Sequence, residues 1–164
     1  MTAAAPLSRP FAFDTEFGAG GVNVKARAFS RDTTGGGAEA YLGAFGGGLG
    51  VTDGSEGNGS GNAHTVDNTG RDNYVLFTFD QQVVVDAAYL GYVFCDSDLR
   101  LWIGTLPDAF TADIMLSDAL LAGLGFTEVN TTTSDQARWA DFNGGNVAGN
   151  VLVIAANTGE AGTV

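Results

Sequence analysis

Seven oxygen-bearing side chains gather in two polar turns of this 164-residue chain and are the residues best suited to chemistry. Five lie in or just after one long loop and two in a second turn: Asp53, Glu56, Asp67, Asn68 and Asp72, then Asp96 and Asp98. Calcium takes about six to eight oxygen ligands from carboxylates, amides and backbone carbonyls. Glycines in such loops let the backbone fold its carbonyls around the ion. Residue type and crowding therefore predict a calcium site.

The spacing of these acids leaves a second interpretation open. Residues 67–72 read Asp-Asn-Thr-Gly-Arg-Asp, which lacks the alternating acids and the closing Glu of a helical calcium hand. Residues 46–53 only loosely resemble a calcium-binding nonapeptide, and they do not repeat. Asp and Asn also cap backbone amides in ordinary solvated turns. A structural turn is therefore the alternative to a metal site in both places.

The chain has one histidine and one cysteine, which leaves little material for catalysis. His64 alone cannot supply the several imidazoles of most catalytic zinc sites, and we expect it in a surface loop. No Gly-x-Ser-x-Gly turn presents a nucleophile, and Cys95 lies in an apolar run that predicts a strand. Paired carboxylates for glycoside cleavage are recognisable only by their separation in space. We therefore expect a protein that is not an enzyme.

Aromatic side chains offer a different kind of binding site. Exposed rings stack on sugar faces, but most Trp and Tyr residues here lie inside apolar runs, where core packing is expected. Trp139, which lies between Arg138 and Asp141, is the best candidate for exposure. A carbohydrate-binding module with a glycan partner is therefore the first alternative function.

The charge balance excludes other partners. The chain has 19 Asp and Glu, 7 Lys and Arg, and a formal net charge of −12. This charge repels phosphate, so neither nucleic acid nor an anionic membrane is expected to bind. The chain contains no run of about 18 apolar residues, so membrane insertion is not expected. The Ala-rich start is typical of a chain whose signal peptide has been cleaved, and residues 1–10 are expected to be flexible or processed.

The elements that must position these side chains are mostly strands. Strict alternation predicts a half-buried strand over 22–29, and apolar β-branched and aromatic runs predict several more. These further strands are expected at 38–45, 74–79, 83–85, 89–94, 99–103, 137–142 and 151–155. Residues 80–82 are expected to form a hairpin turn or a bulged corner between two of them, and residues 151–155 to form a central strand buried on both faces.

One segment departs from the strand pattern. Residues 113–124 space their apolar side chains as a helix does, with Ser117 or Asp118 available as a cap. The long polar stretch over 52–71 has no apolar periodicity and is expected to be a functional loop. Chain length and pattern together predict residues 1–164 as a single domain, an all-β antiparallel sandwich with one short helix.

Several short motifs together resemble a known family. They are Gly-Leu-Gly-Val at 48–51, His-Thr-Val-Asp-Asn at 64–68, Gly70, Asp72 and the strand over 74–79. With Leu-Gly at 90–91 and Asp-Ser-Asp at 96–98, they are similar to exosortase-sorted (PEP-CTERM type) bacterial surface proteins over roughly residues 22–103. The resemblance implies secretion, a jelly-roll-like sandwich and a role at the cell surface or in the extracellular matrix, with no established catalysis.

The chain departs from that family at its end. It shows no Pro-Glu-Pro motif, apolar tail or basic terminus, and we therefore expect the anchor either to have been removed or never to have been present. In such proteins a further strand commonly follows the last apolar run, and its absence would leave an open edge. Self-association through that edge strand, into a filament or surface layer, is the second alternative function.

Overall fold

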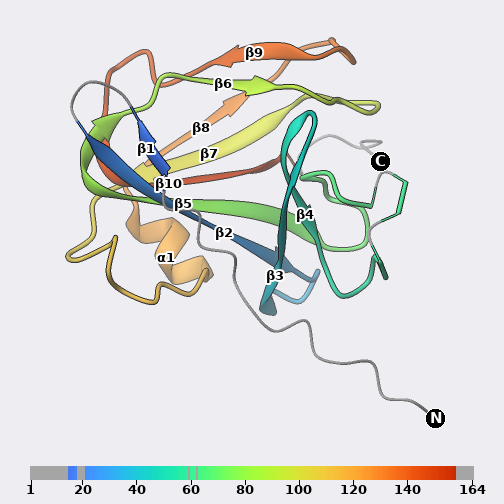
Figure 1. The fold of residues 1–164 in the computed structure, drawn as a ribbon, viewed down its shortest axis with the longest axis horizontal. Coiled ribbons are helices and arrows are strands. Elements are labelled where there is room, and N and C mark those ends of the chain that lie inside the picture. The colour runs from blue at the N-terminus through green and yellow to red at the C-terminus, as the bar shows by residue number, and fades with distance from the viewer. Residues whose placement is uncertain (1–14, 18–20, 59, 62, 158–164) are drawn as a thin grey trace.

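The computed structural model describes residues 15–17, 21–58, 60–61 and 63–157, and its regular elements are antiparallel strands and one short helix (Figure 1). In chain order the elements are β1 (Thr15–Phe17), β2 (Val22–Arg31), β3 (Gly37–Phe45), β4 (Gly48–Thr52), β5 (Asp72–Val84), β6 (Ala87–Leu90), β7 (Leu99–Gly104), α1 (Asp118–Gly123), β8 (Phe126–Asn130), β9 (Arg138–Asp141) and β10 (Ala148–Ala156). The prediction for residues 1–10 lies outside the described residues.

One large sheet runs through the molecule. Its strand order is β4-β3-β2-β5-β10-β7-β8, and β1 pairs with β2 beside this path. The central strand β10 pairs with β5 on one side and β7 on the other, so that Val153 lies opposite both Leu76 and Trp102. Val151, Leu152 and Val153 are all buried, which confirms a final strand covered on both faces.

Two separate covers form a second layer on one face of this sheet. β3 pairs with β2 only over residues 37–40 and then continues over residues 41–45 paired with β4 alone, which makes the β3–β4 cover. β6 and β9 pair with each other and make the β6–β9 cover. Phe77 of β5 packs beneath both covers. The predicted all-β architecture is confirmed as sandwich-like, whereas the jelly-roll-like connectivity stays a prediction.

The opposite face is covered by α1 and the segment before it. Leu116 and Leu121 pack on Phe29, Leu76 and Val153 of the sheet. Ser117 caps the helix, because its side chain accepts a hydrogen bond from the Leu120 backbone N–H at 3.2 Å. The predicted short helix and its cap are confirmed. No helix of the described residues is long and apolar enough to cross a membrane.

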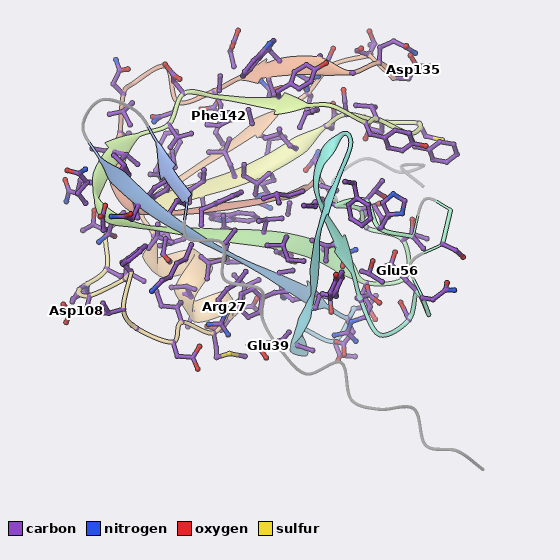
Figure 2. The ribbon with its side chains drawn as sticks, in the orientation of Figure 1. Arg27, Glu39, Glu56, Asp108, Asp135 and Phe142 are labelled. Carbon is purple, nitrogen blue, oxygen red and sulfur yellow. The ribbon has the colours of Figure 1, made fainter. Side chains whose placement is uncertain are left out.

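The prediction of a half-buried β2 is confirmed, because buried Val24, Ala26 and Ala28 alternate with partly exposed Asn23, Lys25 and Arg27. The segment before α1 partly covers this polar face. Lys25 Nζ donates to the Phe110 carbonyl at 2.8 Å, and Arg27 donates to the Ile114 carbonyl at 2.8 Å. Arg27 also forms ion pairs with Asp113 and with Glu39, which lies near it in Figure 2. Alternation predicted the two faces of the strand but not what covers them.

The corner expected at residues 80–82 takes its bulged form and not that of a hairpin. β5 continues through these residues, and its pairing with β10 shifts register there, with Val83 opposite Gly149 and Thr78 opposite Val151. One expectation about a strand end is wrong. β6 ends at Leu90 instead of running to residue 94. Cys95 is therefore not in a strand: it is exposed, with a φ of 69°, in a tight turn.

Candidate functional site

A groove of about 1060 Å³ opens between the two covers. Its floor is apolar and includes Val75 and Phe77 of β5 and Ile154 of β10. One wall comes from residues 46–50 and 63–70, and the other from residues 88–94. The walls meet where the β3–β4 turn approaches the chain after β6, since a Cβ on Gly91 would overlap the Gly47 carbonyl oxygen.

Glycine at position 50 lets the loop lie directly on β4. A Cβ on Gly50 would overlap the backbone oxygen of His64, so a side chain there would push the loop off the strand. The His64 ring in turn stacks on Phe45, with 4.3 Å between ring centroids. His64 is half-buried in the groove wall, where its packing helps to fix the wall.

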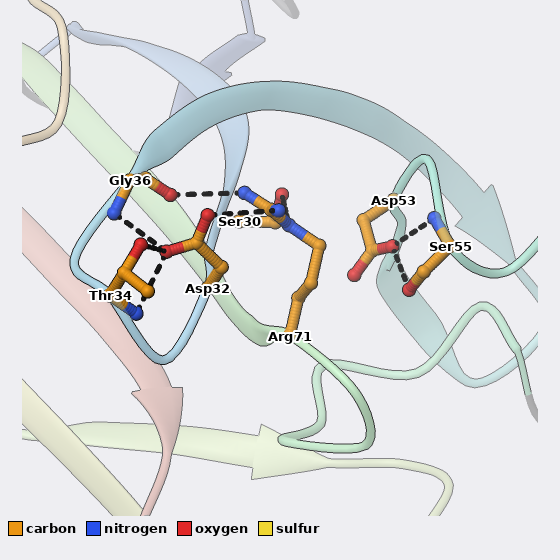
Figure 3. Close-up of polar contacts among 7 residues, drawn as sticks. All are labelled: Ser30, Asp32, Thr34, Gly36, Asp53, Ser55 and Arg71. Carbon is orange, nitrogen blue, oxygen red and sulfur yellow. Dashed lines mark hydrogen bonds and ion pairs between the residues drawn. The ribbon is translucent and has the colours of Figure 1, made fainter.

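Two predicted carboxylates meet at the start of the acidic loop, which we define as residues 53–70. The Asp53 backbone N–H donates to Glu56 Oε2 at 2.7 Å. Asp53 Oδ1 accepts hydrogen bonds from the backbone N–H and the hydroxyl of Ser55, each at 2.6 Å (Figure 3). Asp53 is only 1% exposed, and its other oxygen, Oδ2, has no hydrogen-bond partner among the described residues.

A third carboxylate, that of Asp67, acts on Glu56 electrostatically. Burial raises the pKa of Glu56, and repulsion from the Asp67 and Asp53 carboxylates adds to the rise, while the hydrogen bond from the Asp53 backbone opposes it. Glu56 lies in the loop that follows β4 (Figure 2). Both Asp67 oxygens have partners, because Oδ1 accepts from the Thr69 N–H at 2.9 Å and Oδ2 from the Thr65 hydroxyl at 2.7 Å.

Asn73 belongs to this region, although the sequence interpretation did not include it. Its side chain is fully buried, and neither amide atom has a hydrogen-bond partner in the part of the chain that is described. The amide faces the Glu56 carboxylate closely enough to lower its pKa, and the Asn73 backbone N–H donates to the Asp67 carbonyl at 2.8 Å. An Asn at an inward position of an apolar strand was the available signal.

The structure does not bring the other predicted ligands to this pair. Asp72 lies on the opposite face of β5 from Asn73, where burial raises its pKa and Arg31 lowers it. The Asn68 amide donates to the Asn157 carbonyl at 3.2 Å. In the second turn, the Asp96 side chain accepts from the Asp98 N–H at 3.0 Å, and that of Asp98 accepts from the Thr132 N–H at 2.6 Å.

The second turn therefore has the geometry of capped turns, which was the alternative to a metal site there. Over the described residues as a whole, no three carboxylate, histidine or cysteine side chains are arranged to hold a metal ion. A cation at Asp53 and Glu56 would have to draw further oxygens from amides, backbone carbonyls or water, which calcium accepts.

Aromatic rings are exposed along the β6 side of the groove. Trp139 is 65% exposed, which confirms the prediction made for it, and its ring lies 5.3 Å from that of Tyr89. Tyr92 and Phe94, which line the groove, are also exposed. The β6–β9 cover therefore presents rings to solvent beside an apolar groove.

The chain matches no protein-family model, and its comparison with curated proteins and with solved structures gives no match either. The resemblance to exosortase-sorted surface proteins therefore stays a prediction. The chemistry open to the chain is set by the groove, by its exposed rings and by the buried carboxylates at the start of the acidic loop.

Proposed function

We propose that this chain is a secreted, calcium-stabilised β-sandwich with a structural or adhesive role at the bacterial cell surface or in the extracellular matrix. The groove between the two covers carries the proposal. It combines an apolar floor with walls that hold both exposed rings and acids, which suits the binding of an extended ligand rather than a small, enclosed one. The acidic composition and the family resemblance support an extracellular location.

The polar groups of the groove favour binding over catalysis. Asp67, Asp96 and Asp98 line it, but each accepts a hydrogen bond from a backbone N–H of its own or a neighbouring loop. His64 packs on Phe45 in the wall. These side chains hold loops in place, and we propose no enzymatic activity for the chain.

Calcium has a defined task in this proposal, which is to hold the acidic loop as one wall of the groove. Thermal unfolding with added calcium and with a chelator tests this task. A ligand bound only by the folded state raises the melting midpoint, so the midpoint should be higher in calcium. Coincident curves would contradict the calcium part of the proposal and leave the groove as a metal-independent binding surface.

A carbohydrate-binding module is the second candidate function, and the contact between Trp139 and Tyr89 favours it. Glycan array binding should be lost in Trp139→Ala, while the variant keeps its fold because the ring is largely exposed. Tyr41→Ala, which removes an exposed ring from β3, is the matched control and should bind as the unsubstituted protein does. Equal loss in both variants, or no glycan bound at all, would exclude this candidate.

A further inference from the structure

We propose that Asp53, Glu56 and Asn73 are the protein ligands of one calcium ion at the start of the acidic loop. The inference rests on the calcium part of the proposed function and deepens it by naming the ligands. It replaces Asp72 with its neighbour Asn73 and does not involve Asp96 or Asp98. The ion would tie the end of β4, through Asp53, to the start of β5, through Asn73.

Unpartnered polar atoms carry this inference. Asp53 Oδ2 and both amide atoms of Asn73 are buried without a hydrogen-bond partner among the described residues. Buried polar atoms are almost always paired, because leaving water without a new partner is unfavourable. Both side chains lie beside Glu56: the Asp53 backbone donates to its carboxylate, and the Asn73 amide faces it. A cation among the three would satisfy Asp53 Oδ2 and the Asn73 carbonyl together.

A self-capped turn does not account for these atoms. Asp53 and Glu56 do cap each other's turn, and the Glu56 N–H donates to the Asp53 carbonyl at 3.2 Å. Those bonds occupy Asp53 Oδ1 and Glu56 Oε2. Among the described residues, they leave Asp53 Oδ2 and the Asn73 amide oxygen without a partner. Asp53 follows the end of β4, whereas Asn73 lies at the start of β5. A turn alone needs neither.

The local charge favours a divalent cation. The Asp67 and Asp53 carboxylates both repel the Glu56 carboxylate, which adds to the effect of burial in raising the pKa of Glu56. Arg71 lies nearby in Figure 3, but it directs its guanidinium to Ser30, Gly36 and Asp32. Of the described residues, only Asp32 forms an ion pair with Arg71. The charge on Asp53 and Glu56 is therefore left for another cation.

The donor atoms select calcium among divalent ions. All three proposed ligands supply oxygen, which excludes the nitrogen and sulfur ligands that zinc prefers. Magnesium demands near-octahedral geometry and gives up its water reluctantly, whereas calcium accepts irregular sets with amide oxygens and water. Asp67 adds negative charge without being a ligand, since Thr65 and Thr69 already occupy both of its oxygens.

Three variants test the site in chelator-treated protein titrated with calcium chloride. Asp53→Asn and Asn73→Leu change the proposed ligands, and Asp72→Asn is the control that removes the same charge from the opposite face of β5. Isothermal titration calorimetry should give one calcium ion per chain. Asp53→Asn should weaken binding at least about tenfold, because ligand charge sets calcium affinity. Asp72→Asn should bind as the unsubstituted protein does.

Asn73→Leu distinguishes a ligand from a structural amide. In chelator it should melt at a higher temperature than the unsubstituted protein, because an apolar side chain of similar size replaces a buried amide without a partner. Adding calcium should not raise the melting temperature of Asn73→Leu above its value in chelator. Melting below the unsubstituted protein in chelator would show that the Asn73 amide is hydrogen-bonded in the fold, and would overturn the inference.

Two further outcomes would overturn it, and they separate it from the proposed function. A calcium response that survives in both ligand variants, or is lost equally in Asp72→Asn, would leave calcium stabilisation standing and this site wrong. The unsubstituted protein could also show neither a heat of calcium binding nor a melting midpoint shifted by calcium. That result would exclude both the site and calcium stabilisation. The binding of ligands in the groove would be untouched by that result.

Discussion

Glu56 shows at the scale of one residue how burial and neighbouring charge govern the acidic loop. Its pKa is raised above the ordinary value of 4.5 by burial and by two carboxylates. Without metal, the folded protein therefore holds a proton on Glu56 over a pH range in which the unfolded chain has lost it. The contribution of Glu56 to stability is then fully present below pH 4.5 and is lost as pH rises through the folded pKa.

Glu56→Gln should remove this dependence. In chelator, the free energy of unfolding of the unsubstituted protein should fall relative to that of Glu56→Gln as pH rises from about 4 to 7, because only Glu56 acquires a repelled charge. Urea unfolding at several pH values measures the difference. Asp141→Asn, at an exposed position of β9, is the control and should run parallel to the unsubstituted protein. Parallel curves for Glu56→Gln would contradict the prediction.

Asp72 and Asn73 show why the candidate site was only partly predictable from sequence. Oxygen-bearing residue types predicted Asp53, Glu56 and Asp67, and these three do interact. Adjacent strand residues, however, point to opposite faces, so only one of positions 72 and 73 can reach the loop. Which one does so depends on the register of β5 with β2, and register is a non-local property.

At the scale of elements, the turn between β9 and β10 depends on one buried side chain. Asn143 adopts a φ of 54° and is fully buried. Its amide donates to the Val85 carbonyl at 3.0 Å and to the Val147 carbonyl at 2.9 Å, and its oxygen accepts from the Val147 N–H at 2.8 Å. The side chain thus joins the end of β9 to the chain before β6, which positions the β6–β9 cover.

Asn143→Ala should destabilise the fold by about 2 to 4 kcal/mol, since it leaves buried backbone groups unpaired and places alanine in the left-handed region. Asn146→Ala is the matched control, because Asn146 has the same φ of 54° but is exposed. Asn146→Ala should lower the free energy of unfolding by only about 1 kcal/mol, the cost of placing alanine in the left-handed region. Chemical denaturation measures both, and equal losses would show that the buried hydrogen bonds contribute nothing.

Local pattern predicted the elements better than their surroundings. Alternation gave the two faces of β2, and helical spacing with Ser117 gave α1. The exact course of β5 could not be predicted, because local pattern left a hairpin and a bulged corner open at residues 80–82, and pairing with β10 near Val84 decides between them. The covering of Lys25 and Arg27 was hidden for the same reason, since it depends on contacts with residues more than 80 positions away.

At the scale of the whole molecule, the net charge of −12 opposes folding through self-repulsion. Part of the positive charge is used internally: Lys25 and Arg27 bind the segment before α1, and Arg71 binds the turn that contains Asp32. The acidic loop keeps three interacting carboxylates. Two effects of ions on stability are therefore expected, general screening of the surface and specific binding at the loop.

Matched ionic strength separates these two effects. Sodium chloride should raise the melting midpoint gradually, because screening acts over about 10 Å at 0.1 M. Calcium chloride at the same ionic strength should raise it further by a few degrees, since about 1 kcal/mol shifts a domain of this size by roughly 2 to 4 °C. Magnesium chloride has the same charge and should follow sodium more closely, because the irregular oxygen set does not suit it. If the melting midpoints depended on ionic strength alone, the carboxylates would repel one another without holding an ion. An additional rise in the midpoint with calcium, one that saturates as the calcium concentration increases, requires a binding site.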